Sequence, residues 1–120
     1  MCLVAISAIA EDKYAEAVFT TKNYDFGSVK ESDGPVSCYF EFTNTGNKPL
    51  LIIDVTASCG CTRPEYPSKP IKPGKTGKIK VTYSPIGRPG VFKKTVKVKT
   101  NGRERTSTLH IEGSVIPKSK

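Results

Sequence analysis

The chain has 120 residues, a length that predicts one domain with a single hydrophobic core. No stretch approaches the roughly 20 consecutive apolar residues of a membrane-spanning helix, which argues against a transmembrane protein. The net charge of +8 is concentrated in residues 69–105, where twelve Lys or Arg accompany one acidic residue. A basic half of this kind attracts acidic proteins, nucleic acid or anionic cell-surface polymers.

Residues 1–16 predict a signal-like or disordered N-terminal segment ahead of the folded domain. The first ten residues are small and apolar, and Ala8-Ile9-Ala10 resembles a small-x-small signal-peptidase site. The basic stretch that opens a complete signal is missing, so the run is interpreted as the tail of a longer one. The alternative is a frayed cytosolic N-terminus. We therefore expect an extracytoplasmic protein, in the periplasm or at the cell surface, either secreted or lipid-anchored.

Alternation of apolar and polar residues predicts short strands in the first half of residues 17–117. Two short pieces cover 18–20 and 24–29, and Gly27 breaks the second as a bulge or a change of sheet. A half-buried strand covers 36–43, with every second residue apolar. Residues 50–55 are apolar on both faces, which predicts a central and well-covered strand.

The second half is divided by turn signals. Prolines at 64, 67, 70 and 73 suit a polyproline II ligand or, as we favour, an irregular sheet edge where proline blocks pairing. Lys72-Pro73-Gly74-Lys75 predicts a type II turn. Strands follow at 78–83, 91–99 and 108–112, and Asn101-Gly102 predicts a type I′ hairpin. Residues 118–120 are a polar tail.

About seven short strands without crossover helices predict an all-β fold, an immunoglobulin-like β-sandwich over residues 17–117. The antibody version of this fold has a cysteine on each of two facing strands and a tryptophan between them. Here Cys38 lies on a suitable strand, but residues 91–100 contain no cysteine and the chain contains no tryptophan. The core is therefore expected to hold without a disulfide between the sheets.

Five motifs, taken in order, resemble the bacterial domain of unknown function 1573 family over about residues 18–116. The resemblance implies an immunoglobulin-like domain, related in architecture to the pilus-chaperone and major sperm protein sandwiches. Members usually carry secretion or lipoprotein signals, and the resemblance implies no function. The motifs are Tyr24-Asp25-Phe26-Gly27-Ser28-Val29, Phe40-Glu41-Phe42-Thr43-Asn44-Thr45-Gly46, Ser58-Cys59-Gly60-Cys61-Thr62, Ile71-Lys72-Pro73-Gly74 and Gly87-Arg88-Pro89-Gly90.

Cys59 and Cys61, one glycine apart, are the candidate disulfide or thiol pair. A structural bend is the favoured interpretation, followed by a disulfide, whose small ring would be strained and oxidising. Two thiolates also suit Cu(I) or half of a zinc site. Cys38 is expected to face the core and His110 the solvent, so we expect no metal site and no cofactor. A catalytic thiol would need a nearby base, which the sequence does not supply.

A candidate basic surface consists of lysines that alternation places on outer strand faces. A solvated face that guards against edge-to-edge aggregation is the favoured interpretation. Binding of an anionic polymer is the alternative, and nucleic acid is disfavoured because no aromatic residues interleave these positions. The lysines are Lys78, Lys80, Lys93, Lys97 and Lys99.

These observations predict an exported, non-catalytic immunoglobulin-like module that binds a protein or another component of the cell envelope. The absence of a recognisable acid–base constellation is the reason for expecting no enzyme. The alternative is a thiol redox or copper-handling protein that uses Cys59 and Cys61.

Overall fold

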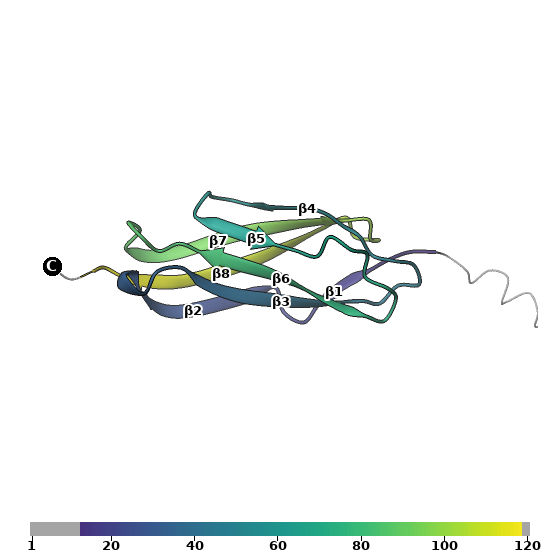
Figure 1. Cartoon of the computed structure of the whole chain (residues 1–120), viewed down its shortest axis with the longest axis horizontal. Helices are drawn as coiled ribbons and strands as arrows, with labels where there is room; N and C mark the ends of the chain where they lie inside the picture. Colours follow the sequence, from purple (N-terminus) through teal and green to yellow (C-terminus); the bar gives the residue numbers. More distant parts are fainter. Residues whose placement is uncertain (1–12, 119–120) are drawn as a thin grey trace, which may run out of the picture.

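Two four-stranded β-sheets pack face to face in the computed structural model, which describes residues 13–118 (Figure 1). The β3–β6 sheet has the strand order β1-β3-β6-β5, and the β7–β8 sheet has the order β2-β8-β7-β4. In chain order the elements are β1 (Ala17–Phe19), β2 (Asn23–Lys30), the 3₁₀ helix η1 (Glu31–Asp33), β3 (Val36–Asn44), β4 (Ile52–Ala57), β5 (Thr62–Glu65), β6 (Thr76–Tyr83), β7 (Gly90–Thr100) and β8 (Thr106–Ile116).

The predicted all-β immunoglobulin-like sandwich is confirmed, with eight strands in the described residues instead of about seven. No helix among these residues is long and apolar enough to cross a membrane. The expected signal-like sequence falls mostly in residues 1–12 and the end of the polar tail in 119–120, both outside the described residues.

The chain changes sheet between β1 and β2, ahead of Gly27, and the strand beyond the predicted seven is β5 in the proline-rich segment. β1 pairs antiparallel with β3, whereas β2 pairs parallel with β8 in the opposite sheet. Within β2 the register shifts between Asp25 and Ser28, and Gly27 has a φ of 70°, which favours glycine. The Gly27 amide donates a hydrogen bond of 2.8 Å to the Asp25 carboxylate. The predicted bulge is therefore present.

The core lies between the sheets and follows the predicted alternation. Tyr83 of β6 stacks on Phe92 of β7 with ring centroids 4.0 Å apart, which joins the two sheets. Cys38 is the free cysteine of the described part of the chain, and its burial raises the pKa of its thiol to about 12. Side chains with no exposed surface include Phe40, Phe42, Leu50, Ile79, Val81, Val96, Val98, Leu109 and Ile111.

The expected central position of residues 50–55 is wrong. β4 pairs only with β7 and forms an edge of its sheet, and Leu50 instead bridges to Ile71. A register shift between Ile52 and Asp54 breaks the alternation, and Leu51 and Ile53 are 40% and 51% exposed. A run that is apolar on both faces predicts burial on both faces, but the outer face of β4 is open.

The type I′ turn predicted at Asn101-Gly102 is also wrong. A longer loop joins β7 to β8, and Gly102 is not among the glycines with positive φ. The Asn101 side chain accepts a hydrogen bond of 2.8 Å from the Leu51 amide and donates one of 3.3 Å to the Pro49 carbonyl. These contacts join distant parts of the chain, which local turn preferences do not encode.

Two other turn and edge predictions are confirmed. Gly74 has a φ of 82°, and the Lys75 amide donates to the Lys72 carbonyl at 3.0 Å, as the type II turn requires. Pro64 lies in β5, an edge strand of the β3–β6 sheet, where a missing N–H is tolerated.

Residues 14–16, just ahead of the predicted domain, pack against it. Ala15 is fully buried, and its carbonyl accepts a hydrogen bond of 2.8 Å from the Arg103 amide. The Arg103 guanidinium lies 3.8 Å from the centroid of the Tyr14 ring. The sequence does not reveal this packing, because three residues are too few to show a periodicity. The contacts of these residues with Arg103 also depend on the distant β7–β8 loop.

A fully buried asparagine holds this end of the sandwich together. The Asn44 Oδ1 accepts hydrogen bonds from the amides of Glu16 at 3.2 Å and Gly46 at 3.0 Å. Its Nδ2 donates to the carbonyls of Lys48 at 2.8 Å and Ile71 at 2.9 Å. The side-chain amide therefore makes all four of its possible hydrogen bonds, as burial of this group requires.

Candidate functional site

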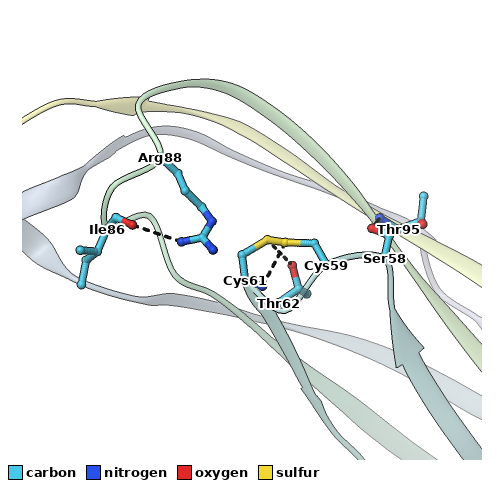
Figure 2. The surroundings of a disulfide bond; sticks show 7 residues. All are labelled: Ser58, Cys59, Cys61, Thr62, Ile86, Arg88 and Thr95. Atoms are coloured by element: carbon cyan, nitrogen blue, oxygen red, sulfur yellow. Dashed lines mark hydrogen bonds between the residues drawn. A yellow bond between two sulfur atoms is a disulfide. The ribbon is translucent and has the colours of Figure 1, made fainter.

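The Cys59-Gly60-Cys61 corner is the place where the chain crosses from β4, an edge of the β7–β8 sheet, to β5, an edge of the other sheet (Figure 2). Ser58 holds the departing end against β7. Its amide donates to the Thr95 carbonyl at 2.9 Å, and the Thr95 amide donates to the Ser58 hydroxyl at 3.1 Å.

The arriving end of the corner is anchored on the β3–β6 sheet. The Cys61 carbonyl accepts a hydrogen bond of 2.9 Å from the amide of Ser84, just after β6. The Thr62 amide donates to the Cys59 carbonyl at 3.2 Å, which closes the turn. The backbone is therefore fixed on both sides of the corner by hydrogen bonds that do not involve sulfur.

A disulfide joins Cys59 to Cys61 in the structure, with the Cα atoms 5.2 Å apart. This separation lies inside the range of roughly 4.4–6.8 Å that disulfides tolerate. The Cys61 amide donates a hydrogen bond of 3.0 Å to the Cys59 sulfur. Cys61 is 3% exposed, whereas Cys59 is only partly buried, so the two sulfurs differ in their access to solvent.

This disulfide restricts the unfolded chain very little. In the loop-entropy model, closing a loop of three residues stabilises the folded state by about 1.6 kcal/mol, whereas closing a 15-residue loop stabilises it by about 3 kcal/mol. The backbone hydrogen bonds at Ser58 and Cys61 already fix the corner. Stability alone is therefore a weak reason for a disulfide at this position.

Thr62 contacts the buried sulfur of Cys61, and Arg88 points towards the corner. The Thr62 hydroxyl lies 3.6 Å from this sulfur. Figure 2 shows the Arg88 side chain extending from the loop between β6 and β7 towards the corner, with its Nη1 donating to the Ile86 carbonyl at 3.2 Å. Burial raises the pKa of the Tyr83 phenol, and the charge of Arg88 acts in the opposite direction.

Arg88 is a residue that the sequence analysis missed at this site. Its loop carries the Gly87-Arg88-Pro89-Gly90 motif, and no local pattern indicates that this loop folds towards the cysteines. The register of β5 on β6, with Thr62 opposite Tyr83, is what brings the two segments together. Only this register could have revealed that Arg88 lies near the cysteines, and a register depends on the pairing of distant segments.

The residues considered as further metal ligands do not join the cysteine pair. Cys38 is buried in the core, and His110 lies between Asn23 and Thr95 in the middle of the β7–β8 sheet. His110 is partly buried, and its Nδ1 is buried without a hydrogen-bond partner. Within residues 13–118, no three His, Cys, Asp or Glu side chains gather as metal ligands would.

The five candidate lysines do not form one surface. Lys78 and Lys80 lie on β6, and the other three, at positions 93, 97 and 99, lie on β7 in the opposite sheet. Outward-facing residues of two packed sheets point in opposite directions. The sequence pattern identified outer faces but did not assign strands to sheets.

Acidic residues face most of these lysines from neighbouring strands. Such cross-strand pairs each contribute about 0.2–1 kcal/mol and reduce the local positive potential. Lys97 differs, because Thr56 and Thr108 lie opposite it. The lysine–acid pairs in register are Lys78 with Glu41, Lys80 with Glu65, Lys93 with Glu112 and Lys99 with Asp54.

A family model described as "Protein of unknown function (DUF1573)" matches residues 17–115. A comparison with curated proteins gave no match. Among solved structures, a protein of unknown function from Porphyromonas gingivalis W83 is similar with a TM-score of 0.74 and 14% identity. The match covers 90% of this chain and 50% of that one, so the chain spans about half the length of this relative.

The YadV chaperone is similar with a TM-score of 0.56 and 18% identity, over 86% of this chain and 52% of that chain. The C. elegans protein WR4, a member of the MSP family, has a TM-score of 0.51 and 10% identity, over 88% of this chain and 100% of that chain. Segments of two proteases and of two glycoside hydrolases are also similar. At such identities the likeness shows the fold alone, and it confirms the expected relation to chaperone and major sperm protein sandwiches.

Proposed function

Because the chain belongs to the family of proteins of unknown function DUF1573, we propose a function from its own surface. It is an exported immunoglobulin-like module that binds a protein of the cell envelope and catalyses no reaction. The observation that carries this proposal is the exposed apolar pair at the start of edge strand β4, Leu51 just before the strand and Ile53 within it.

This apolar pair sits on a rigid backbone. Leu51 accepts a hydrogen bond of 3.2 Å from the Asn101 amide and donates one of 2.8 Å to the Asn101 side chain. Ile53 protrudes at the register shift between Ile52 and Asp54. Preformed apolar contacts bind more tightly, because little conformational entropy is lost on association.

The proposed partner is an extended segment in which apolar and acidic side chains alternate. β4 has no strand on its outer edge among the described residues, and extended segments add to such edges through backbone hydrogen bonds. Beside it, a shallow depression on the outer face of the sheet is lined by Thr56, Ala57, Ser58, Thr95 and Lys97. Lys97 has no acid opposite it, so it is free to meet a carboxylate of the partner while an apolar side chain covers Ile53.

Two observations support export. The structure contains a disulfide, and disulfides persist mainly in oxidising compartments. The sequence Ala8-Ile9-Ala10 resembles a signal-peptidase site. Mass spectrometry of the mature protein, released from the host by osmotic shock, tests both the compartment and the processed N-terminus. Recovery only with the cytosolic fraction contradicts export.

Site-specific photocrosslinking in the native host tests the binding role. A crosslinking amino acid replaces Ile53 in one strain and Val91 in another. Val91 is the matched control, because it is 87% exposed and lies on β7 of the same sheet. We expect one discrete adduct from position 53 and none from position 91, mapped to a segment with alternating apolar and acidic residues.

A second substitution makes the binding test specific. Lys97→Glu should reduce the yield of the adduct from position 53 several-fold, because the carboxylate that approaches Lys97 is then repelled. Equal adducts from positions 53 and 91, or a yield unchanged by Lys97→Glu, contradict the proposed surface. Thermal unfolding of each variant shows that the fold is retained.

The Cys59–Cys61 pair supports a second candidate function, thiol redox chemistry. The observation that favours it over copper handling is the disulfide, because metal binding requires thiolates and the bonded sulfurs supply none. Metal analysis of the reduced and oxidised protein separates the two chemistries. Copper retained by the reduced wild type and lost from a Cys59→Ser, Cys61→Ser double variant would favour copper handling.

A further inference from the structure

We propose that the Cys59–Cys61 disulfide is a thiol–disulfide exchange site for accessible thiols, in which Cys59 is attacked and Cys61 is the leaving sulfur. The inference rests on the second candidate function, thiol redox chemistry, and is independent of the β4 surface and its partner. It rests on the unequal access to the two sulfurs, the donors beside each of them and the anchoring of the corner.

Access favours attack on Cys59. Cys61 is 3% exposed and packs in the core, whereas Cys59 is only partly buried. Gly60 between them is exposed, and apart from its two chain neighbours no residue has an atom within 4 Å of the position that a Cβ would occupy there. An incoming thiolate must approach the sulfur that it attacks, so the open side of the corner leads it to Cys59.

Each sulfur has a donor for the negative charge that it carries after bond cleavage. For Cys61 this donor is the Thr62 hydroxyl at 3.6 Å, and Figure 2 shows the Arg88 guanidinium reaching towards the same side. For Cys59 it is the Cys61 amide at 3.0 Å. Hydrogen-bond donors and cations stabilise thiolates, and a stabilised thiolate leaves faster.

The exchange takes place in two steps. A thiolate R–S⁻ attacks the Cys59 sulfur, the electron pair of the disulfide moves to Cys61, and a mixed disulfide of Cys59 with R remains. A second R–S⁻ attacks the R sulfur of this mixed disulfide, so R–S–S–R forms and Cys59 leaves as a thiolate. Both thiolates of the protein then take up the protons that the two R–SH molecules released. Re-forming the Cys59–Cys61 disulfide requires an external disulfide oxidant, such as oxidised glutathione.

The backbone anchors keep the corner in place when the disulfide opens. The hydrogen bonds of Ser58 with Thr95 and of Ser84 with Cys61 involve only backbone groups and one hydroxyl. The reduced cysteines therefore stay close together, and the pair is ready to close again. A disulfide that served only to hold the corner would not need this second set of bonds.

Trapping of the mixed disulfide on the wild-type chain tests the proposal without any substitution. The oxidised protein is mixed with reduced glutathione, quenched with acid and N-ethylmaleimide, and mapped by mass spectrometry. We expect glutathione on Cys59 and maleimide on Cys61. The reverse assignment, or a disulfide that resists glutathione until the protein is unfolded, overturns the proposal. A short cysteine-containing peptide replaces glutathione in a second arm, which separates small-molecule thiols from peptide thiols as substrates.

Two single-cysteine variants in a Cys2→Ser, Cys38→Ser background give the rates. With oxidised glutathione, Cys61→Ser should form a mixed disulfide at Cys59 at least about tenfold faster than Cys59→Ser forms one at Cys61. Equal rates, or a faster reaction at Cys61, refute the assigned roles.

The positioning role of Arg88 has its own readout. Arg88→Gln should slow cleavage of the wild-type disulfide by glutathione severalfold and shift the pH profile of the Cys61 thiol upwards, with little change in thermal stability. If Arg88→Gln leaves both the rate and the pH profile unchanged, the guanidinium does not assist the leaving sulfur.

Discussion

Asn44→Asp is expected to destabilise the domain more strongly than other substitutions of equal size. The two side chains have nearly the same shape, so the change leaves the packing intact. The Asn44 Nδ2, however, donates to the carbonyls of Lys48 at 2.8 Å and Ile71 at 2.9 Å. A carboxylate at this position removes both hydrogen bonds and places an oxygen against two acceptors.

The expected loss in the free energy of unfolding is about 3–5 kcal/mol at pH 7. The two lost hydrogen bonds account for about 2 kcal/mol, and the Lys48 carbonyl, which loses its donor, costs about 1–3 kcal/mol more. The Ile71 carbonyl keeps the hydrogen bond of 2.9 Å from the Leu50 amide. The site is fully buried, so water does not compensate. For a domain of this size, the loss corresponds to a fall of about 12–20 °C in Tm.

Urea unfolding followed by circular dichroism measures this loss. Asn23→Asp, on the exposed face of β2, introduces the same charge and should change stability by less than about 0.5 kcal/mol. The effect of Asn44→Asp should shrink as the pH falls towards 4, since a protonated acid again donates one hydrogen bond. A loss of less than about 1 kcal/mol at pH 7 would refute the reasoning.

Three further predictions concern other parts of the molecule. Glu31 accepts two backbone hydrogen bonds that lower its pKa below 4.5. The stability that the Glu31 carboxylate adds is therefore present above pH 4.5 and is lost as the pH falls through the lowered pKa. Glu31→Gln should remove this part of the acid dependence of Tm. Gly113→Ala places a Cβ 2.8 Å from the Phe92 ring and should lower the free energy of unfolding by about 1–3 kcal/mol. Gly60→Ala places its Cβ in open space and should lower it by under about 1 kcal/mol in the same unfolding assay. Cys38, whose pKa is about 12, should resist iodoacetamide at pH 8 in the native protein and react in urea, as mass spectrometry would show; rapid native labelling would contradict its burial.

The sandwich was predictable from the sequence because its central strands alternate without interruption. β3 buries Cys38, Phe40 and Phe42 and exposes the residues between them, as a half-buried strand requires. β4 was misplaced because its alternation breaks at Ile53, and a run that is apolar on both faces does not reveal whether a second layer covers it.

The candidate site was predictable only in part. Cys59 and Cys61 stand out in the sequence, and their spacing allowed the disulfide as one alternative. Arg88 and Thr95 reach the corner through the pairing of β5 with β6 and of β4 with β7, which no local pattern contains. The lysines were assigned to outer faces correctly, but the division between two opposite faces depends on which sheet each strand joins.

The parallel pairing of β2 with β8 has a mechanical consequence. β1 and the end of β8 lie at opposite ends of the molecule (Figure 1). Tension applied through the two ends of the domain therefore pulls β2 and β8 past each other along their length, and it loads their six register pairs together instead of one after another. We expect the domain to resist stretching best in this direction, and Val29→Pro, which removes a donor from β2, should lower the unfolding force in single-molecule pulling. An unchanged force would place the mechanical resistance in another strand pair.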